Sequence, residues 1–268
     1  MKPSQVDMQG YHDRGFVIIE HFFDDRELAA MQAELQQLQG SGASRNVATN
    51  GDGQTISQTK SNLQIIPLNH ASDLFRVFPF QPKVLDMVSR CIGEPFVRQL
   101  DQIFSKPPDS GVGTEWHQDN AYFKISDPTK GVGMWTALHN AKRANGTLEV
   151  VPASHLAALD HQHSPNSILS RCIVDDESAA VPVEVEAGGV IFFNYGIAHR
   201  TGPNLSESER AGLAFHFLRT DYINREQTAW EYIHLRGEQS SHGVSEYGHD
   251  LSNAWQQQVD RVLKRAGQ

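Results

Sequence analysis

The sequence predicts a mainly β fold with flanking helices, of the double-stranded β-helix type that is also called a jelly roll or cupin-like fold. One observation is that residues 96–219 contain several short apolar and β-branched runs separated by glycine-containing turns, which is typical of antiparallel sandwiches and barrels. The other is that apolar residues recur at helical spacing before this region and again near the C-terminus.

The size and composition are those of an ordinary globular protein. The chain has 268 residues, of which 39% are hydrophobic and 21% charged, and we expect one domain over residues 1–268. The formal net charge of -9 argues against nucleic acid or a membrane surface as a partner. Residues 1–7 lack the apolar segment of a secretion signal. Only Cys91 and Cys172 are present, which predicts reduced thiols and a cytoplasmic location. The oligomeric state stays open.

The predicted helices lie outside the β region. Asp24 is followed three residues later by Glu27, close to a capping box, and apolar residues then recur at helical spacing to Leu38, which predicts a helix over about 24–39. Residues 72–92 fit two short helices separated by prolines. An amphipathic helix that packs on the sandwich is expected within the tail from residue 228 to 268. Residues 40–58 are polar and glycine-rich, which indicates either a mobile surface loop or a lid over a ligand.

The predicted strands follow in chain order. Residues 15–20 and 60–66 are two early candidates, and 96–104 is the first strand of the β core. The turn sequence Asn145-Gly146 predicts a hairpin between residues 133–139 and 147–151. Alternating valines predict a half-buried strand over 181–185, and residues 190–193 and 212–218 complete the core.

The candidate metal ligands are His117, Asp119 and His199. On an extended chain, residues i and i+2 point to the same face, so His117 and Asp119 can aim at one ion. His199 follows a later strand and supplies a third ligand. A jelly roll is expected to fold the strand of His117 next to the final strand, which Arg210 enters. Two histidines and one carboxylate form the facial triad of non-haem Fe(II) oxygenases.

A candidate anion anchor lies eleven positions (210 minus 199) after His199. Arg210 can pair its guanidinium with a carboxylate, and Thr201 can add a hydroxyl donor. The triad together with this anchor indicates a 2-oxoglutarate-dependent oxygenase that uses Fe(II), O2 and 2-oxoglutarate.

The chain resembles the phytanoyl-CoA dioxygenase family, which is related to ectoine hydroxylase. The resemblance rests on Lys106-Pro107-Pro108-Asp109, on Trp116-His117-Gln118-Asp119, on residues 145–155, and on His199 and Arg210. It implies iron ligation by His117, Asp119 and His199, and a catalytic co-substrate anchor at Arg210. It also implies co-substrate contacts at Thr201, Trp135, Gln102 and Asn62, although Asn62 stands where phytanoyl-type members carry lysine. Related halogenases lack the carboxylate that Asp119 provides, so the resemblance implies hydroxylation.

The predicted reaction hydroxylates an unactivated C–H of a small metabolite and releases succinate and CO2. The segments expected to frame the pocket mouth are residues 40–58, 152–178 and 228–248, and they contain few basic residues, namely Arg45, Arg171 and Arg236. This favours a small polar or neutral metabolite over an acyl-CoA, whose phosphates need a basic cluster. Two alternatives are a zinc-dependent hydrolase and a non-catalytic metal-binding jelly roll.

Other polar residues near the triad receive mostly structural interpretations. His161 and His163 lack a third metal ligand, and His155 is expected to be structural. His216 alternates with phenylalanines and is expected in the interior near the iron. Gln118 and Tyr122 flank the ligands, where either could contact substrate.

Overall fold

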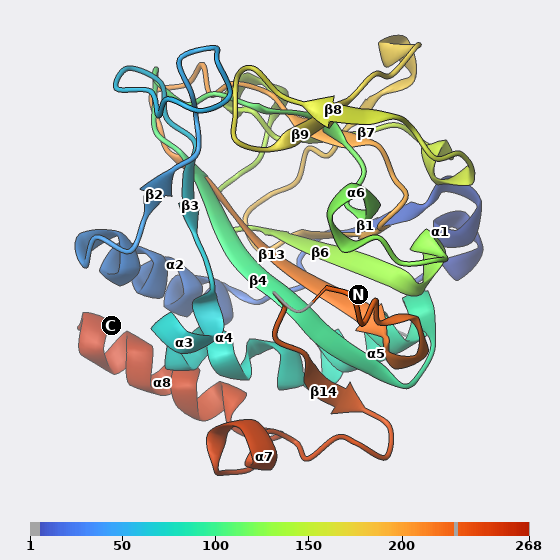
Figure 1. The fold of residues 1–268 in the computed structure, drawn as a ribbon. Helices are drawn as coiled ribbons and strands as arrows, with labels where there is room; N and C mark the ends of the chain where they lie inside the picture. Colours follow the sequence, from blue (N-terminus) through green and yellow to red (C-terminus); the bar gives the residue numbers. More distant parts are fainter. Residues whose placement is uncertain (1–5, 228–229, 268) are drawn as a thin grey trace.

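Two facing antiparallel sheets form the centre of the protein, and helices cover the outer face of the larger sheet (Figure 1). The computed structural model describes residues 6–227 and 230–267. The larger sheet has the strand order β1-β11-β6-β13-β4-β3-β2, and β14 also pairs with β4. The bounds of these strands are β1 Phe16–Ile19, β11 Val190–Asn194, β6 Gly131–Ala137, β13 Arg210–Arg219, β4 Phe96–Lys106, β3 Leu63–Ile65, β2 Arg45–Asn46 and β14 Ile233–Arg236.

The smaller sheet has the strand order β10-β7-β12-β5. Its bounds are β10 Val181–Pro182, β7 Leu148–Val150, β12 His199–Thr201 and β5 Thr114–His117. A separate hairpin joins β8 (His161–His163) to β9 (Ser170–Cys172). The predicted fold class is confirmed, with two sheets that face each other and do not close into a barrel.

Strand β13 shows how the sequence separates the layers of the fold. Phe215 and Phe217 belong to the apolar core that includes the helices, whereas Ala214 belongs to the core between the two sheets. His216 also faces the inside, where it lines a cavity. Since neighbouring strand residues point to opposite faces, β13 places polar groups in the cavity and aromatic rings under the helices.

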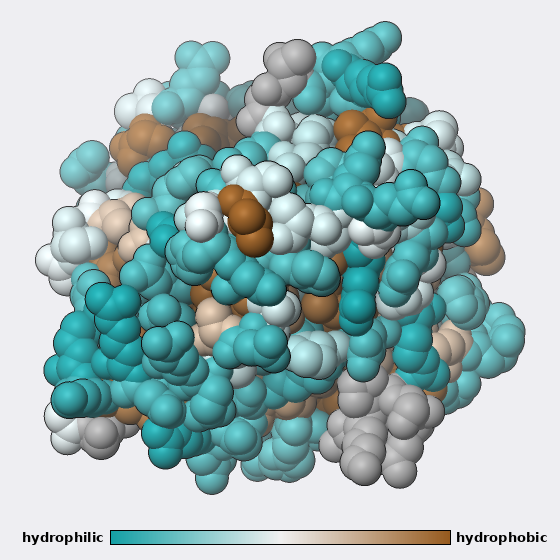
Figure 2. Space-filling view, turned by 90° about the horizontal axis from the view of Figure 1, so that it is seen from below, coloured by the Kyte–Doolittle hydropathy of each residue, from teal (hydrophilic) through white to brown (hydrophobic). Residues whose placement is uncertain are grey.

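The helices pack mainly against the large sheet. Their bounds are α1 Met8–Arg14, α2 Asp25–Gly40, α3 Leu68–Ala71, α4 Asp73–Val77, α5 Pro82–Ile92, α6 Asn120–Phe123, α7 Val244–Tyr247 and α8 Trp255–Ala266. The predicted capping box is confirmed, because Asp24 and Glu27 exchange backbone-to-carboxylate hydrogen bonds of 2.8 and 3.0 Å. The expected C-terminal helix is α8, but it packs mainly against α2 and α4 and not on the sandwich itself. The face seen from below is largely hydrophilic (Figure 2).

The predicted hairpin at Asn145-Gly146 is wrong. Strand β6 lies in the large sheet and β7 in the small one, so the turn carries the chain between sheets. Residues Arg143–Asn145 form a short 3₁₀ turn, and Gly146 ends it with a φ of 76°. Glycine favours this left-handed conformation in hairpins and in other turns alike, so the dipeptide did not distinguish them.

The remaining expectations concern loops and location. The predicted strand over 181–185 shortens to two residues, and helices α1 and α3 were not predicted. Residues 40–58 contain β2, and their loop hydrogen-bonds to the segment 165–168 through Thr49 and Gly53. Within the described residues, no helix is long and apolar enough to cross a membrane. Both cysteines are free thiols and buried; the cytoplasmic location stays a prediction.

Candidate active site

The three predicted metal ligands come together between the two sheets. His117 ends β5 and His199 begins β12, and these residues are direct partners in the antiparallel register. Asp119 lies at the start of α6 with helical backbone angles, φ -58° and ψ -29°. The expectation of an extended His-x-Asp segment is therefore wrong. The turn into α6, rather than strand alternation, brings the carboxylate back toward the imidazoles.

The ligand atoms have the separations of a metal site. The Asp119 Oδ1 atom lies 3.8 Å from His117 Nε2 and 3.7 Å from His199 Nε2, and one ligand atom from each residue fits within 4.8 Å of the others. The Nδ1 atoms lie 2.8 Å from the Glu115 carbonyl and 3.0 Å from the Ile197 carbonyl. A backbone acceptor at Nδ1 holds the proton there, so Nε2 is the free ligand atom.

Burial makes this a site for neutral imidazoles. Burial, together with the His199 ring, lowers the pKa of His117 to about 3. Burial likewise lowers the pKa of His199 to about 4. Metal ligation requires deprotonated histidines, so the cavity preselects the correct form. His216 lies with its Nδ1 atom 3.4 Å from Asp119 Oδ2, on the oxygen that does not face the other two imidazoles.

The triad lines a cavity of about 240 Å³ between the sheets. Of the predicted co-substrate residues, Arg210, Thr201, Trp135 and Gln102 also line this cavity. Asn62 does not; its amide donates to the Thr114 hydroxyl at 3.2 Å. The structure thus brings four of the five together beside the triad.

Arg210 is a fully buried cation that forms no ion pair with any residue in the described part of the chain. Its exposed fraction is 0%, and burial lowers the pKa of its guanidinium to about 10, so it stays charged at neutral pH. Its Nη2 atom donates to the Gly146 carbonyl at 2.6 Å, but Nε and Nη1 have no partner among the described residues. A buried charge without a partner is costly. A carboxylate bound in the cavity would supply the missing partner.

Trp135 and Thr201 complete the surroundings of this cation. The Arg210 guanidinium lies 5.8 Å from the centre of the Trp135 ring, which in turn packs on Gly212. A Cβ atom at Gly212 would lie 2.2 Å from Trp135 Nε1, so only glycine fits. The Thr201 hydroxyl accepts a hydrogen bond of 3.0 Å from the Thr114 amide. Its own proton is therefore free to donate into the cavity.

Lys106 is a site residue for which the sequence analysis assigned no role. It pairs with Arg210 across β4 and β13 and is 1% exposed. Its ammonium donates to the carbonyls of Gly146 and Gly202. Burial and the Arg210 charge hold the pKa of Lys106 well below its ordinary value. Its only signal in the sequence was its place before Pro107-Pro108.

Other residues near the ligands support the surrounding loops. The Gln118 amide group donates to the carbonyls of Ala157 and Gly196 and does not line the cavity. His161 accepts a hydrogen bond of 2.9 Å from the Gln118 backbone, which makes it part of the loop anchor. Tyr122 lines the cavity, and its hydroxyl accepts from the Ser170 amide at 2.9 Å. His155 lies 3.2 Å from the His12 carbonyl.

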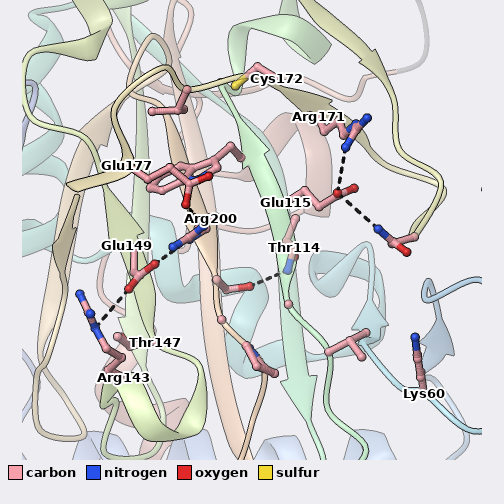
Figure 3. A pocket seen from close by; sticks show the side chains of 18 of the residues that line it. Lys60, Thr114, Glu115, Arg143, Thr147, Glu149, Arg171, Cys172, Glu177 and Arg200 are labelled. Carbon is pink, nitrogen blue, oxygen red and sulfur yellow. Dashed lines mark hydrogen bonds and ion pairs between the residues drawn. The ribbon is translucent and has the colours of Figure 1, made fainter. Parts of the chain in front are cut away.

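A second, larger hollow of about 780 Å³ includes the outer surface of the small sheet (Figure 3). Its charged side chains pair with one another: Glu149 contacts Arg143 at 3.3 Å and Arg200 at 2.6 Å. Glu115 contacts Arg171 at 3.6 Å. The triad does not line this hollow. The ion pairs of the hollow leave few charges free for a ligand.

The fold and the inner cavity define a class of enzymes. Two histidines and a carboxylate are a ligand set that holds iron on one side and leaves other positions open, and the buried guanidinium of Arg210 lines the same cavity. The protein is an Fe(II)- and 2-oxoglutarate-dependent oxygenase. More closely, the chain belongs to the phytanoyl-CoA dioxygenase (PhyH) family, whose model matches residues 11–212.

Relatives with known names agree with this placement. The chain is 27% identical over 242 residues to the peroxisomal phytanoyl-CoA dioxygenase of Bos taurus, covering 83% of this chain and 71% of that protein. It is 30% identical over 191 residues to phytanoyl-CoA dioxygenase 1 of Oryza sativa subsp. japonica, covering 67% of this chain and 66% of that protein.

Solved structures share the fold. The carbocyclase SnoK from nogalamycin biosynthesis superposes with a TM-score of 0.68 at 18% identity, covering 90% of this chain and 91% of that chain. EctD from S. alaskensis, solved with 2-oxoglutarate and 5-hydroxyectoine, superposes with a TM-score of 0.64 at 18% identity, covering 82% of this chain and 78% of that chain. The epimerase SnoN was solved with Fe3+ and α-ketoglutarate. It superposes with a TM-score of 0.68 at 20% identity, covering 81% of this chain and 84% of that chain.

Proposed function

We propose that this oxygenase hydroxylates an unactivated C–H of a small metabolite and converts 2-oxoglutarate to succinate and CO2. The observation that supports this most strongly is that one cavity holds both the triad and the unpaired Arg210. The triad accounts for the metal, and Arg210 accounts for an acidic co-substrate. Neither feature explains the other, yet the reaction needs both.

In this proposal His117, Asp119 and His199 bind Fe(II). The two imidazoles are neutral and present Nε2, while Asp119 presents Oδ1. His216 lies beside the other Asp119 oxygen and keeps the carboxylate turned toward the metal, as outer partners of metal ligands commonly do. Because Asp119 occupies its position, the proposed outcome is hydroxylation.

In this proposal Arg210 and Thr201 hold the far carboxylate of 2-oxoglutarate. The free guanidinium N–H groups and the Thr201 hydroxyl supply the donors, and Trp135 forms the apolar wall beside them. Gln102 faces the same cavity. Asn62 would act only through Thr114, to which it is hydrogen-bonded.

When bound, Fe(II) and 2-oxoglutarate activate O2, and loss of CO2 from the co-substrate drives oxygen insertion into a C–H bond. The protein supplies orientation and exclusion of water. Apolar side chains form much of the cavity wall, among them Leu100, Phe104, Leu169 and Trp230. Such a wall keeps bulk water from the reacting centre and accepts an aliphatic or cyclic substrate.

The cavity favours a free metabolite over a CoA thioester. Its volume of about 240 Å³ lies below the roughly 300–1,000 Å³ typical of pockets for drug-sized ligands. Within residues 6–227 and 230–267, Arg45 and Arg210 are the only Lys or Arg side chains that line it. Lys60 lines the outer hollow and not this cavity.

A hydrolase is less consistent with the lining. Zinc hydrolysis needs a general base beside the metal-bound water. Among the described residues that line the cavity, Asp119 is the single carboxylate, and the triad already uses it. A binding protein without catalysis would leave unexplained why the triad, Thr201 and Arg210 line the same cavity.

The test is iron-dependent succinate formation. The purified protein is loaded anaerobically with Fe(II), then given 2-oxoglutarate and O2 with a metabolite panel and, separately, an acyl-CoA panel. We expect succinate and hydroxylated product with free metabolites, and loss of both when Zn(II) replaces iron. Succinate formation only with acyl-CoAs, inhibited by free CoA, would reject the proposed substrate class. No succinate under any of these conditions would reject the catalytic proposal.

A further inference from the structure

Most polar groups of the inner cavity already have partners or proposed roles. The triad and His216 surround the metal position, and Arg210 and Thr201 face the co-substrate. The Tyr122 hydroxyl is bonded to the Ser170 backbone, and the Thr114 hydroxyl accepts from Asn62. What remains is a row of three side chains, Arg45, Gln64 and Gln102, which all line the cavity; Gln102, at the inner end of the row, is also an expected co-substrate contact.

This row runs across three neighbouring strands. Arg45 on β2 pairs with Gln64 on β3, and its Nε and Nη2 atoms donate to Gln64 Oε1 at 2.9 and 2.6 Å. Gln64 Nε2 in turn donates to Gln102 Oε1 on β4 at 2.6 Å. Each amide oxygen is thereby used as an acceptor, so the guanidinium is oriented. The Arg45 Nη1 group and the Gln102 amide hydrogens stay available to a ligand.

Arg45 is a charge without a counter-charge at the rim of the cavity. Its side chain is exposed, and no carboxylate among the described residues forms an ion pair with it; its partner is the neutral Gln64. A neutral partner orients a guanidinium without reducing its charge. The oriented guanidinium at the rim can therefore bind an anionic group of a ligand.

We propose that the substrate of this enzyme carries a carboxylate that Arg45 binds, attached to an apolar body that fills the cavity toward the metal. This rests on the proposed function, because it assumes that oxidation occurs at the triad. The apolar body is expected because Ile66, Leu100, Phe104 and Leu169 surround the row. A carboxylate is favoured over a phosphate because the rim offers one cation, whereas phosphates usually engage several.

The strand spacing sets the length of this body. The guanidinium lies beside Gln64 on β3, and the metal position lies beside His216 on β13, with β4 between them. Adjacent strands are about 4.8 Å apart, so two spacings separate the two strand positions by about 10 Å across the sheet. An offset along β4 adds to this separation, because Gln64 pairs with Phe104 whereas His216 pairs with Leu100. The apolar body must therefore span at least about 10 Å, which monocarboxylates of medium or greater length do and short-chain acids do not.

The experiment uses the iron-loaded full chain and a matched panel. The panel contains medium-length straight, branched and cyclic monocarboxylates, each with its primary amide, methyl ester and a phosphate monoester of equal length. Two quantities are measured: succinate formation above the level without substrate, and the shift in melting temperature. The variants are Arg45→Gln, Arg45→Lys and, as a control with the same change in charge, Lys60→Gln, because Lys60 lies in the outer hollow.

We expect acids to stimulate succinate formation while their amides and esters do not. Arg45→Gln should raise the apparent KM of a responding acid at least about tenfold, Arg45→Lys should recover part of the loss, and Lys60→Gln should match wild type. Three results would overturn the inference: equal stimulation by acids and esters, stimulation by phosphate esters alone, or no response to any acid in either measurement.

Succinate formation by the wild-type protein distinguishes failure of the carboxylate inference from failure of the proposed function. Iron-dependent enzymes of this class can convert 2-oxoglutarate slowly without substrate. If wild type forms succinate in this way but shows no preference for acids, only the carboxylate inference fails. If wild type forms no succinate with any panel compound or without one, the proposed function fails as well.

Discussion

Replacement of Arg210 by leucine tests the co-substrate anchor most directly. The change removes a guanidinium that is 0% exposed and has two nitrogen donors without a partner. It also removes the 2.6 Å hydrogen bond to the Gly146 carbonyl. That carbonyl keeps Lys106 as a donor, at 3.3 Å. The Gly146 carbonyl therefore keeps a hydrogen-bond donor, and the main effect of the substitution is weaker binding of the co-substrate carboxylate.

The expected loss of affinity is large. Truncation of one partner in a buried, hydrogen-bonded charge pair costs about 2–5 kcal/mol. Since each 1.4 kcal/mol corresponds to tenfold, the KM for 2-oxoglutarate should rise between about 30-fold and several thousand-fold. Arg210→Lys should recover only part of this, because an ammonium does not reproduce the planar guanidinium and would lie close to the ammonium of Lys106.

The assay is succinate formation at varied 2-oxoglutarate, together with iron stoichiometry and urea denaturation of the metal-free protein. Iron binding should be unchanged, because Arg210 is not a ligand. Stability of the metal-free variant should equal or exceed that of wild type, because an unpaired buried charge is removed. Arg219→Leu is the control: Arg219 ends the same strand but pairs with Asp221 at 2.5 Å, outside the cavity.

Two outcomes would refute the reasoning about Arg210. One is an unchanged KM for 2-oxoglutarate in Arg210→Leu, which would mean that the buried charge does not contact the co-substrate. The other is loss of iron together with co-substrate binding, or clear destabilisation of the metal-free variant, which would show that Arg210 maintains the fold of the site.

Three further predictions follow from the same geometry. His117→Ala or His199→Ala should abolish stoichiometric Fe(II) binding and turnover, because two remaining ligands hold the ion poorly; normal iron content by metal analysis would contradict the triad. Gly212→Ala should destabilise the protein by about 1–3 kcal/mol and raise the KM for 2-oxoglutarate, because its Cβ would lie 2.2 Å from Trp135 Nε1; an unchanged urea midpoint and KM would argue against this packing. Lys106 has a lowered pKa in the folded state, so the unfolded chain binds its proton more tightly and wild-type stability should rise as pH increases toward the ordinary lysine pKa of 10.5. Lys106→Met should remove this rise of the unfolding free energy with pH, measured by urea denaturation from about pH 7 to 10. An equal rise in the variant and in wild type would contradict the prediction.

Local patterns in the sequence predicted the parts of the fold that depend on neighbouring residues. The capping box at Asp24 needs only Glu27 three positions away, and it formed as expected. The alternation around His216 likewise predicted which side chains face the interior. The Asn145-Gly146 hairpin failed because the same turn residues serve both a hairpin and a crossing between sheets. The extended His117-x-Asp119 segment failed because Asp119 caps α6, which begins at the next residue, and already has helical backbone angles.

The arrangement of the strands was also only partly predictable. The first and last strands of the site were expected next to one another. The structure instead pairs β5 with β12 in the small sheet and places β13 in the facing sheet. The residues still meet, because the two sheets enclose one cavity. Sequence spacing indicated which groups belong together, but it did not indicate from which side each one enters.

The sequence by itself determined the chemical character of the site, because ligand type is a property of single side chains. Two histidines, one carboxylate and a later arginine can be recognised without coordinates. Only the tertiary structure decided that Lys106 lies opposite Arg210, and that Arg45 reaches the same cavity through Gln64. These contacts depend on the register between strands that are distant in the chain. Register is decided by packing over the whole sheet, so no local pattern encodes it.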